Sequence, residues 1–338
     1  MTNSRRKQLS WQIPFLIFLV VGTVFIIRQK NHAPYRSFEG FVFGTVFHVT
    51  YQSEMSLDSV IMDAFEKVDH ALSMFNAEST VSLINDNRPV PYDDPMFMDV
   101  AQLAFEVAKE TDGDFDPTVA PLVNLWGFGY KQGQDPTDVA IDSVLSFVGY
   151  KRVQLLPHCK VVKDDSRICM DFSAIAKGYG CDAAAEVLRR HGANNFMIEI
   201  GGEIFVSGRS PKGTSWRIGV TKPSDDPEGE NGELQHVLNI TDQGIATSGN
   251  YRNFYYLDGK KVAHTIDPKT GRPVQHSLLS ATVMASTCAQ ADAYSTSFMV
   301  MGMEKAQQVL SRHPEMKAFF IYSAPDGELL TWKSEGLE

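Results

Sequence analysis

The sequence predicts an α+β fold, with mixed or antiparallel sheets and packed helices, preceded by one N-terminal membrane segment. Helix-like and strand-like patterns follow one another irregularly rather than in a βαβ order, no internal repeat is visible, and an apolar run with basic flanks stands at the N-terminus. Irregular mixing of this kind favours α+β over a regular parallel sheet. We therefore divide the 338 residues into a signal anchor and linker over 1–33 and one large domain over 34–338.

The apolar run covers residues 11–27, with basic side chains at positions 5–7, 28 and 30. This length is close to the ~17 residues that a bilayer-spanning helix needs at least. A cleaved signal peptide has the same basic and apolar order, but no A-x-A cleavage pattern follows here, and no cysteine stands near the end for lipid attachment. We expect an uncleaved anchor first and a cleaved signal second, with the large domain on the non-cytoplasmic side.

The charge of the chain is unevenly placed. The formal net charge is −10, from 31 Lys and Arg against 41 Asp and Glu. Residues 1–30 hold five of the basic residues and none of the acidic ones, so residues 31–338 carry −15. Sequence-independent nucleic-acid binding needs Lys and Arg to replace counterions on phosphates. We therefore exclude nucleic acid as a partner.

The four cysteines show no Cys-x-x-Cys spacing and no zinc-like pattern with histidine; they are Cys159, Cys169, Cys181 and Cys288. Cys159 and Cys169 flank the turn-like residues 163–166. A hairpin disulfide and two free thiols are both compatible with this arrangement.

The first half of the large domain predicts one bent strand, several helices and a hairpin. Residues 41–51 are β-branched and aromatic around Gly44, which predicts a strand with a bend. Apolar residues at helical spacing predict helices over 57–75, 98–110 and 139–148. Residues 153–170 predict a hairpin, and residues 174–191 predict a helix that Gly192 ends.

The second half predicts mainly strands, followed by two helices. The strands are expected at 196–200, 204–206, 216–221, 237–240, 253–257 and 280–284, and the helices at 291–301 and 304–312. Residues 223–232 are acidic and rich in Pro and Gly, which indicates a surface loop.

Four segments contain more glycine, acid and small polar residues than a packed core needs. They are residues 114–118, 171–178, 199–203, and a compound set formed by 246–249, 264–271 and 291–296. The first three have structural alternatives: a plain turn, a capped helix with an exposed lysine, and a tight hairpin turn. The second segment also places Lys177 near a helix N-terminus, where backbone N–H groups suit a phosphate.

The compound set holds candidate metal ligands. Asp292 and Thr296 are four residues apart, so they share one face of a helix. A carboxylate, a hydroxyl and a carbonyl are hard oxygen ligands of the kind that Mg²⁺ prefers. Each feature has a simpler explanation by itself, because Asp-x-x-x-Thr is a common capping pattern and His264 alone fits a structural histidine. The density of His, Asp, Pro, Thr and Gly in residues 264–271 favours a functional role.

These segments together resemble the ApbE family over roughly residues 39–325. The resemblance lies in residues 171–178, the Gly201-Gly202 pair, ATSG at 246–249, HTIDPKTG at 264–271 and ADAYST at 291–296. It implies that residues 34–338 form the catalytic domain of a membrane-associated or exported bacterial FAD:protein FMN transferase. Such an enzyme uses Mg²⁺ to split its substrate FAD, attaches FMN through a phosphoester to a threonine or serine of a target flavoprotein, and releases AMP.

The resemblance also implies roles for individual residues. Asp292 and Thr296 match magnesium ligands, with main-chain oxygens from Ala174 and Ser295, and His264 matches a histidine that assists the acceptor hydroxyl. Asp292 and His264 are thus the expected catalytic residues. Contacts to FAD are implied for Phe43, Phe75, Asp114, Phe115, Asp116, Asp171, Lys177 and the backbone near Ile266.

The resemblance further implies location and partners. It places the enzyme at the inner membrane, with its catalytic domain on the periplasmic or extracytoplasmic side, and suggests acceptors such as subunits of membrane redox pumps. The chain departs from the family in having Ser173-Ala174 where two glycines are more usual, and in lacking a lipid-bearing cysteine. A flavin-binding module and an FAD pyrophosphatase remain rival interpretations. The possible metal ligands and His264 argue against an inert binder, but they do not separate transfer from hydrolysis.

Overall fold

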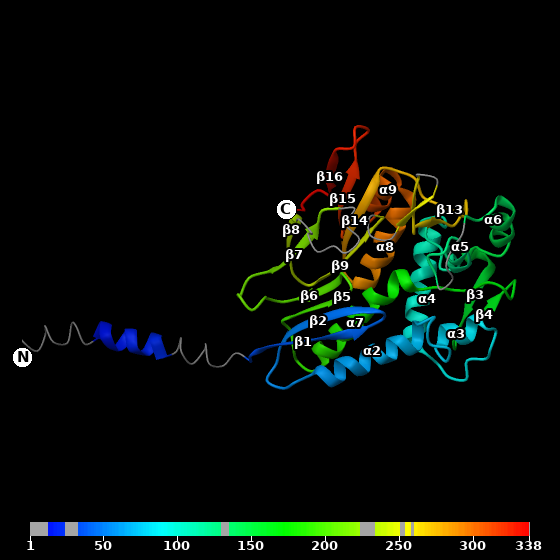
Figure 1. Cartoon of the computed structure of the whole chain (residues 1–338). Helices are drawn as coiled ribbons and strands as arrows, with labels where there is room; N and C mark the ends of the chain where they lie inside the picture. Colours follow the sequence, from blue (N-terminus) through cyan, green and yellow to red (C-terminus); the bar gives the residue numbers. More distant parts are fainter. Residues whose placement is uncertain are drawn as a thin grey trace, which may run out of the picture.

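A single large antiparallel sheet organises the protein. The computed structural model describes residues 13–23, 33–129, 135–223, 234–250, 254–257 and 260–337 (Figure 1). The sheet has eight strands in the order β1-β2-β5-β6-β9-β14-β15-β16, and each neighbouring pair is antiparallel. The strands are β1 (Tyr35–Val42), β2 (Thr45–Gln52), β5 (Phe196–Ile200), β6 (Glu203–Ser207), β9 (Gln243–Gly249), β14 (Leu278–Ala285), β15 (Lys317–Ser323) and β16 (Leu329–Lys333).

Four antiparallel strand pairs accompany this sheet. They are β3 (Val153–Leu156) with β4 (Lys160–Lys163), β7 (Trp216–Thr221) with β8 (Leu234–Ile240), β10 (Phe254–Leu257) with β11 (Lys260–Ala263), and β12 (Ile266–Asp267) with β13 (Arg272–Pro273). Trp216 and Leu238 of the β7–β8 pair are buried in one apolar cluster with Val206 of β6 and Phe319 of β15. The α+β prediction is therefore confirmed, and the sheets are antiparallel.

The helices form the rest of the core. They are α2 (Asp58–Leu72), α3 (Thr80–Asn85), α4 (Pro95–Glu110), α5 (Ala120–Leu125), α6 (Asp138–Leu145), α7 (Ser173–Arg190), α8 (Cys288–Met301) and α9 (Met303–Arg312), with a 3₁₀ turn at Tyr150–Arg152. Two apolar clusters pack them on the sheet. One joins α2 and α7 to β2, β5 and β6, and the other joins α4, α7, α8 and α9 to β9, β14 and β15. Helix α7 packs against both α2 and α8 and lies between them (Figure 1).

Short sequence signals set the ends of these helices. Asp94 caps α4, where its Oδ1 accepts the Phe97 N–H at 3.1 Å and Pro95 occupies the first turn. Gly192 follows α7 with a φ of +78°, a conformation that favours glycine. The end predicted at Gly192 is confirmed, and the helices predicted over 57–75 and 98–110 are present with slightly different bounds.

Two predicted elements are wrong in detail. Residues 41–51 do not form one bent strand; they belong to the β1–β2 hairpin, which reverses at Phe43 and Gly44 with φ values of +50° and +76°. The hairpin within residues 153–170 reverses at 157–159 rather than at 163–166, because β3 pairs with β4 from Val153↔Lys163 to Leu156↔Lys160. No helix was predicted at α3 or α5, and no strand at β9, β11, β12, β13, β15 or β16.

The cysteines and the N-terminal run complete the comparison. All four cysteines are free thiols, so the disulfide alternative for Cys159 and Cys169 is wrong. Within the apolar run, residues 13–23 are helical. Across the parts of the chain that the structure describes, no helix is both long and apolar enough to cross a membrane. The basic flanks of the run and most of the predicted loop at 223–232 lie outside the described residues.

Candidate active site

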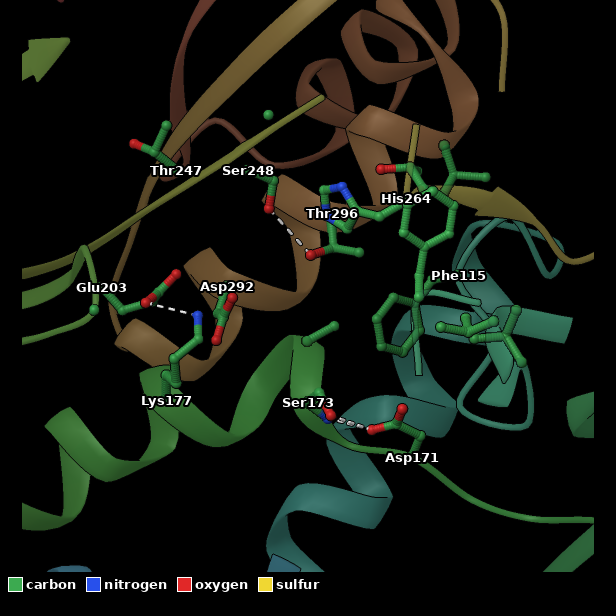
Figure 2. Close-up of a pocket in the computed structure, with 18 of the residues that line it drawn as sticks. Phe115, Asp171, Ser173, Lys177, Glu203, Thr247, Ser248, His264, Asp292 and Thr296 are labelled. Atoms are coloured by element: carbon green, nitrogen blue, oxygen red, sulfur yellow. Dashed lines mark hydrogen bonds and ion pairs between the residues drawn. The ribbon is translucent and has the colours of Figure 1, made fainter. Parts of the chain in front are cut away.

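A cavity of about 970 Å³ opens where the sheet meets α7 and α8. Its walls come from the β5–β6 turn, the beginning of α7, the end of β9, the middle of α8, and the segment around β12. All of the segments singled out in the sequence contribute to it. Figure 2 shows that Lys177, Glu203 and Asp292 form one group in this cavity, while Ser248, Thr296 and His264 form a second group farther along α8.

Lys177 lies between two carboxylates. Its Nζ is 2.7 Å from Glu203 Oε2, and the Asp292 side chain lies beside it (Figure 2). Burial alone would lower the pKa of Lys177, but the negative charges of Asp292 and Glu203 raise it above the usual lysine value. Burial raises the pKa of Glu203 to about 7, and it also raises the pKa of Asp292. The two carboxylates therefore favour the charged form of Lys177, whose side chain is 30% exposed at the cavity.

Asp292 and Thr296 lie on one face of α8, as predicted, and both line the cavity. The Gly178 N–H donates to Asp292 Oδ2 at 3.1 Å. In an α-helix that same N–H is the partner of the Ala174 carbonyl. The Ala174 carbonyl and the Asp292 carboxylate thus lie beside one amide group, and Ala174 also lines the cavity.

The Ser248 hydroxyl links the hydroxyls of Thr296 and Ser295. Ser248 Oγ lies 3.1 Å from Thr296 Oγ1 and 2.9 Å from Ser295 Oγ, and Ser295 Oγ donates to the Asp292 carbonyl at 2.9 Å. Ser295 is fully buried and is not part of the cavity wall. The predicted contact between the Ser295 main-chain oxygen and the metal therefore stays a prediction.

The donor chemistry of this site fits Mg²⁺. Among the described residues, no cluster of three or more His, Cys, Asp and Glu side chains is arranged to hold a metal. The site instead offers one carboxylate, one hydroxyl and a main-chain carbonyl, from Asp292, Thr296 and Ala174. An all-oxygen set with few carboxylates suits Mg²⁺, which keeps several waters and takes further oxygens from substrate phosphates.

The beginning of α7 forms the floor beside this site. Asp171 Oδ1 accepts the Ser173 N–H at 2.8 Å and a hydrogen bond from the Ser173 hydroxyl (Figure 2). Asp171, Ser173 and Ala174 all line the cavity. Asp171 therefore fixes the first turn of α7 in a position that exposes Ala174 to the cavity.

The segment 114–116 forms another wall, and its two carboxylates have different surroundings. Asp114 is bound by two lysines: Lys269 Nζ is 2.8 Å from Oδ1, and Lys305 Nζ is 3.1 Å from Oδ2. Asp116 is bound by backbone and hydroxyl groups, since Oδ1 accepts from the Thr118 N–H at 2.8 Å and Oδ2 accepts from the Tyr150 N–H at 2.7 Å. Asp116 thus stabilises its loop, and Phe115 between them lines the cavity.

The remaining predicted residues divide into two groups. His264, Ile266 and Phe75 line the cavity, and Phe75 is 85% exposed. The His264 ring packs edge-on against Phe128, with ring centroids 6.3 Å apart. Phe43 is not part of the cavity wall; it packs edge-on against Phe65 with centroids 6.0 Å apart. Its predicted contact with FAD stays a prediction.

Two residues of the site had no role assigned from the sequence. Glu203 and Ser248 belong to the segments 199–203 and 246–249, so their position next to glycines was the available signal. The sequence could not predict their partners, because both contacts depend on how distant elements pack. Lys177 meets Glu203 where α7 packs on β6, and Ser248 meets Thr296 where α8 packs on β9.

Comparisons with known proteins point to one family. A model of the ApbE family matches residues 43–320. The FAD:protein FMN transferase of Escherichia coli (strain K12) is 35% identical over 288 residues, which cover 84% of this chain and 78% of that protein. The FAD:protein FMN transferase of Salmonella typhimurium is 34% identical over 309 residues, with 88% and 86% covered.

Solved structures are similar over nearly the whole chain. The flavin transferase ApbE from Vibrio cholerae has a TM-score of 0.79 and 32% identity, covering 90% of this chain and 98% of that one. The flavinyl transferase ApbE from Pseudomonas stutzeri has a TM-score of 0.79 and 28% identity, with 90% and 96% covered. The fold is thus that of a flavin transferase. This chain belongs to the ApbE family and is an enzyme.

Proposed function

We propose that this FAD:protein FMN transferase moves the FMN moiety of FAD to a threonine or serine hydroxyl of target flavoproteins in a Mg²⁺-dependent reaction. The observation that carries the proposal is that one cavity brings together Lys177, His264, Asp292 and Thr296. These residues come from three distant parts of the sequence, and together they offer a cation, a base and oxygen ligands. The names of the relatives support FAD as the substrate and a protein as the acceptor.

The proposed chemistry is a phosphoryl transfer. The acceptor hydroxyl oxygen attacks the phosphorus of the FMN half of FAD, the bond from that phosphorus to the AMP oxygen breaks, and AMP leaves. Positioning and charge neutralisation contribute most to such a reaction. His264 accepts the proton of the hydroxyl, since a neutral imidazole is a suitable base near pH 7. Lys177 supplies positive charge near the pyrophosphate.

Asp292, Thr296 and the carbonyl of Ala174 are the proposed holders of Mg²⁺, which when bound supplies electrostatic stabilisation of phosphate oxygens. The chain's own contribution is the rigid placement of these oxygens. Gly178 orients the Asp292 carboxylate, and Ser248 orients the Thr296 hydroxyl. We also propose acceptors such as subunits of membrane redox pumps, and a catalytic domain on the extracytoplasmic side of the membrane, held by residues 11–27.

Intact-mass measurement tests the proposal directly. The full-length protein is incubated with FAD, Mg²⁺ and a candidate acceptor flavoprotein, with the Asp292→Ala variant as control. Addition of one FMN to the acceptor, with release of AMP, supports transfer. Free FMN and AMP with an unmodified acceptor indicate hydrolysis, and turnover by Asp292→Ala equal to that of the wild type would remove Asp292 from the metal site.

A further inference from the structure

One face of α7 packs against α8. Ala174, Lys177, Gly178, Cys181 and Asp182 follow the spacing i, i+3, i+4, i+7 and i+8, which places them on one side of a helix. Lys177 and Gly178 reach the Asp292 carboxylate from this face, and Asp182 reaches the first turn of α8. The first three residues of this face lie at the cavity or the metal ligands, whereas Asp182 lies one turn away from them.

The Asp182 carboxylate binds the N-terminus of α8 with both oxygens. Oδ1 accepts the Cys288 N–H at 2.8 Å, and Oδ2 accepts the Ala289 N–H at 2.8 Å. Thr287 adds a side-chain cap, because its Oγ1 accepts the Gln290 N–H at 3.2 Å. The first three N–H groups of α8, which have no partner within the helix, are thus bonded, two of them by a residue more than 100 positions earlier in the chain.

Two glycines allow the first turn of α8 to pack closely against α7 and β9. A Cβ atom at Gly178 of α7 would lie 2.4 Å from the Cys288 carbonyl oxygen, and one at Gly244 of β9 would lie 2.3 Å from the Cys288 nitrogen. The backbone of Cys288 therefore packs so closely against positions 178 and 244 that a residue larger than glycine does not fit at either position. The two hydrogen bonds of the Asp182 carboxylate add to this close packing and help to fix the rotation and rise of α8 relative to α7.

Rotation and rise matter because the metal ligands lie on the next two turns. Asp292 is four residues after Cys288, and Thr296 is four residues after Asp292, so the three residues form one row along α8. A shift of the first turn would move the Asp292 carboxylate and the Thr296 hydroxyl away from the Ala174 carbonyl on α7.

We propose that Asp182 is a positioning residue for the magnesium site, acting through its two hydrogen bonds to the N-terminus of α8. The inference rests on the proposed role of Asp292 and Thr296 as magnesium ligands. Asp182 itself touches neither the metal nor the substrate. Burial raises the pKa of Asp182 to about 7, although the two backbone hydrogen bonds lower it. In its ionised form, the carboxylate also matches the positive end of the α8 dipole.

Magnesium binding by the full-length protein tests the proposal without any turnover. The variants are Asp182→Asn, which keeps one acceptor oxygen, and Asp182→Ala, which keeps none. Glu186→Ala is the matched control, because Glu186 lies one turn farther along α7. Among the residues that the structure describes, its carboxylate pairs only with the exposed Arg190. Titration calorimetry with MgCl₂ gives the Kd, and hydrogen exchange reports the amides of residues 288–292.

We expect the Kd for Mg²⁺ to rise by about 10- to 100-fold in Asp182→Ala, by less in Asp182→Asn, and not at all in Glu186→Ala. The amides of residues 288–292 should exchange faster in the same order. If Asp182→Ala does not fold, Asp182→Asn alone decides. Folded variants that bind Mg²⁺ as the wild type does would overturn this inference and leave the proposed function standing. A wild-type protein that binds no Mg²⁺ either alone or in the presence of FAD would overturn both.

Discussion

His264 is the residue on which the distinction between binding and transfer depends. Its side chain lines the cavity, and Phe128 packs against the ring. Loss of a general base typically slows a reaction by about 10²- to 10⁴-fold. We therefore expect His264→Ala to lose transfer by such a factor while its Kd for FAD stays that of the wild type, measured by intact mass and by the quenching of flavin fluorescence.

The control for this prediction is His158→Ala. The His158 side chain is 80% exposed and pairs with Asp93 away from the cavity walls, so this variant should keep full activity. If His264→Ala transfers FMN at the wild-type rate, His264 is not the base. If it fails to bind FAD, its contribution lies in substrate binding instead.

At the scale of single residues, the sequence predicted which residues belong to the site better than it predicted the contacts between them. Asp292 and Thr296 could be placed on one helix face because their spacing is local. The ion pair between Lys177 and Glu203 joins residues of different elements, and no pattern within either segment specifies it. The same limit applies to Asp182, whose partners are backbone groups of a helix far along the chain.

At the scale of elements, helices were predicted more reliably than turns. Helix α7 could be read from its apolar spacing and from Gly192, because both signals lie within the helix and its cap. The β1–β2 reversal was missed because its first turn residue is Phe43, with a φ of +50°, where glycine or asparagine is usual. A phenylalanine at this position gives no turn signal, so residues 41–51 resembled one strand.

The contact between α7 and α8 makes a prediction for Gly178. A Cβ atom there would lie 2.4 Å from the Cys288 carbonyl oxygen and 2.7 Å from its carbon, both of which are backbone atoms. Forcing such an overlap typically costs about 1–3 kcal/mol. We expect Gly178→Ala to lower the free energy of unfolding by this amount in urea titrations. Glu186→Ala, a change at an exposed position of the same helix, is the control; equal stabilities of the two variants would contradict the close packing.

The ends of α4 and α9 are joined by a pH-sensitive contact. His313 Nε2 lies 2.6 Å from Glu110 Oε1, and the Tyr294 hydroxyl donates to the same carboxylate. Burial alone would lower the pKa of His313, but the bonds to Glu110 and Glu315 raise it above the usual histidine value. Burial alone would raise the pKa of Glu110, but Tyr294 and His313 lower it below the usual value.

The sign of the effect follows from these directions. The stability contributed by His313 is fully present below the unfolded pKa of about 6.5 and is lost as the pH rises through the higher folded pKa. The contribution of Glu110 is lost as the pH falls through its lowered pKa. We expect His313→Gln to cost up to about 1 kcal/mol at pH 6, discounted for partial exposure, and less at pH 9. Unfolding titrations at both pH values measure this, and a cost independent of pH would refute it.

At the scale of the whole molecule, the net charge does not predict the local charge of the cavity. Residues 31–338 carry −15, which by itself suggests a protein that repels phosphates. The cavity overcomes this bulk charge locally, because Lys177 and the N-terminal turn of α7 face it and its oxygen ligands suit a divalent cation. The net charge argues against nucleic acid as a partner, which stays a prediction, and it carried no information about a pyrophosphate substrate.

The uneven charge also leads to a prediction about the N-terminus. If residues 11–27 are an uncleaved anchor, the mature protein keeps them, sediments with membranes after carbonate extraction, and exposes its large domain to protease added from the extracytoplasmic side. A lysine at the centre of a membrane helix costs about 2.5–3.5 kcal/mol. We therefore expect Phe18→Lys with Val20→Lys to release the chain from the membrane, while Val139→Lys, a change at an exposed position of α6, leaves it attached. A mature chain whose measured mass lacks residues 11–27 would show that the segment is a cleaved signal instead.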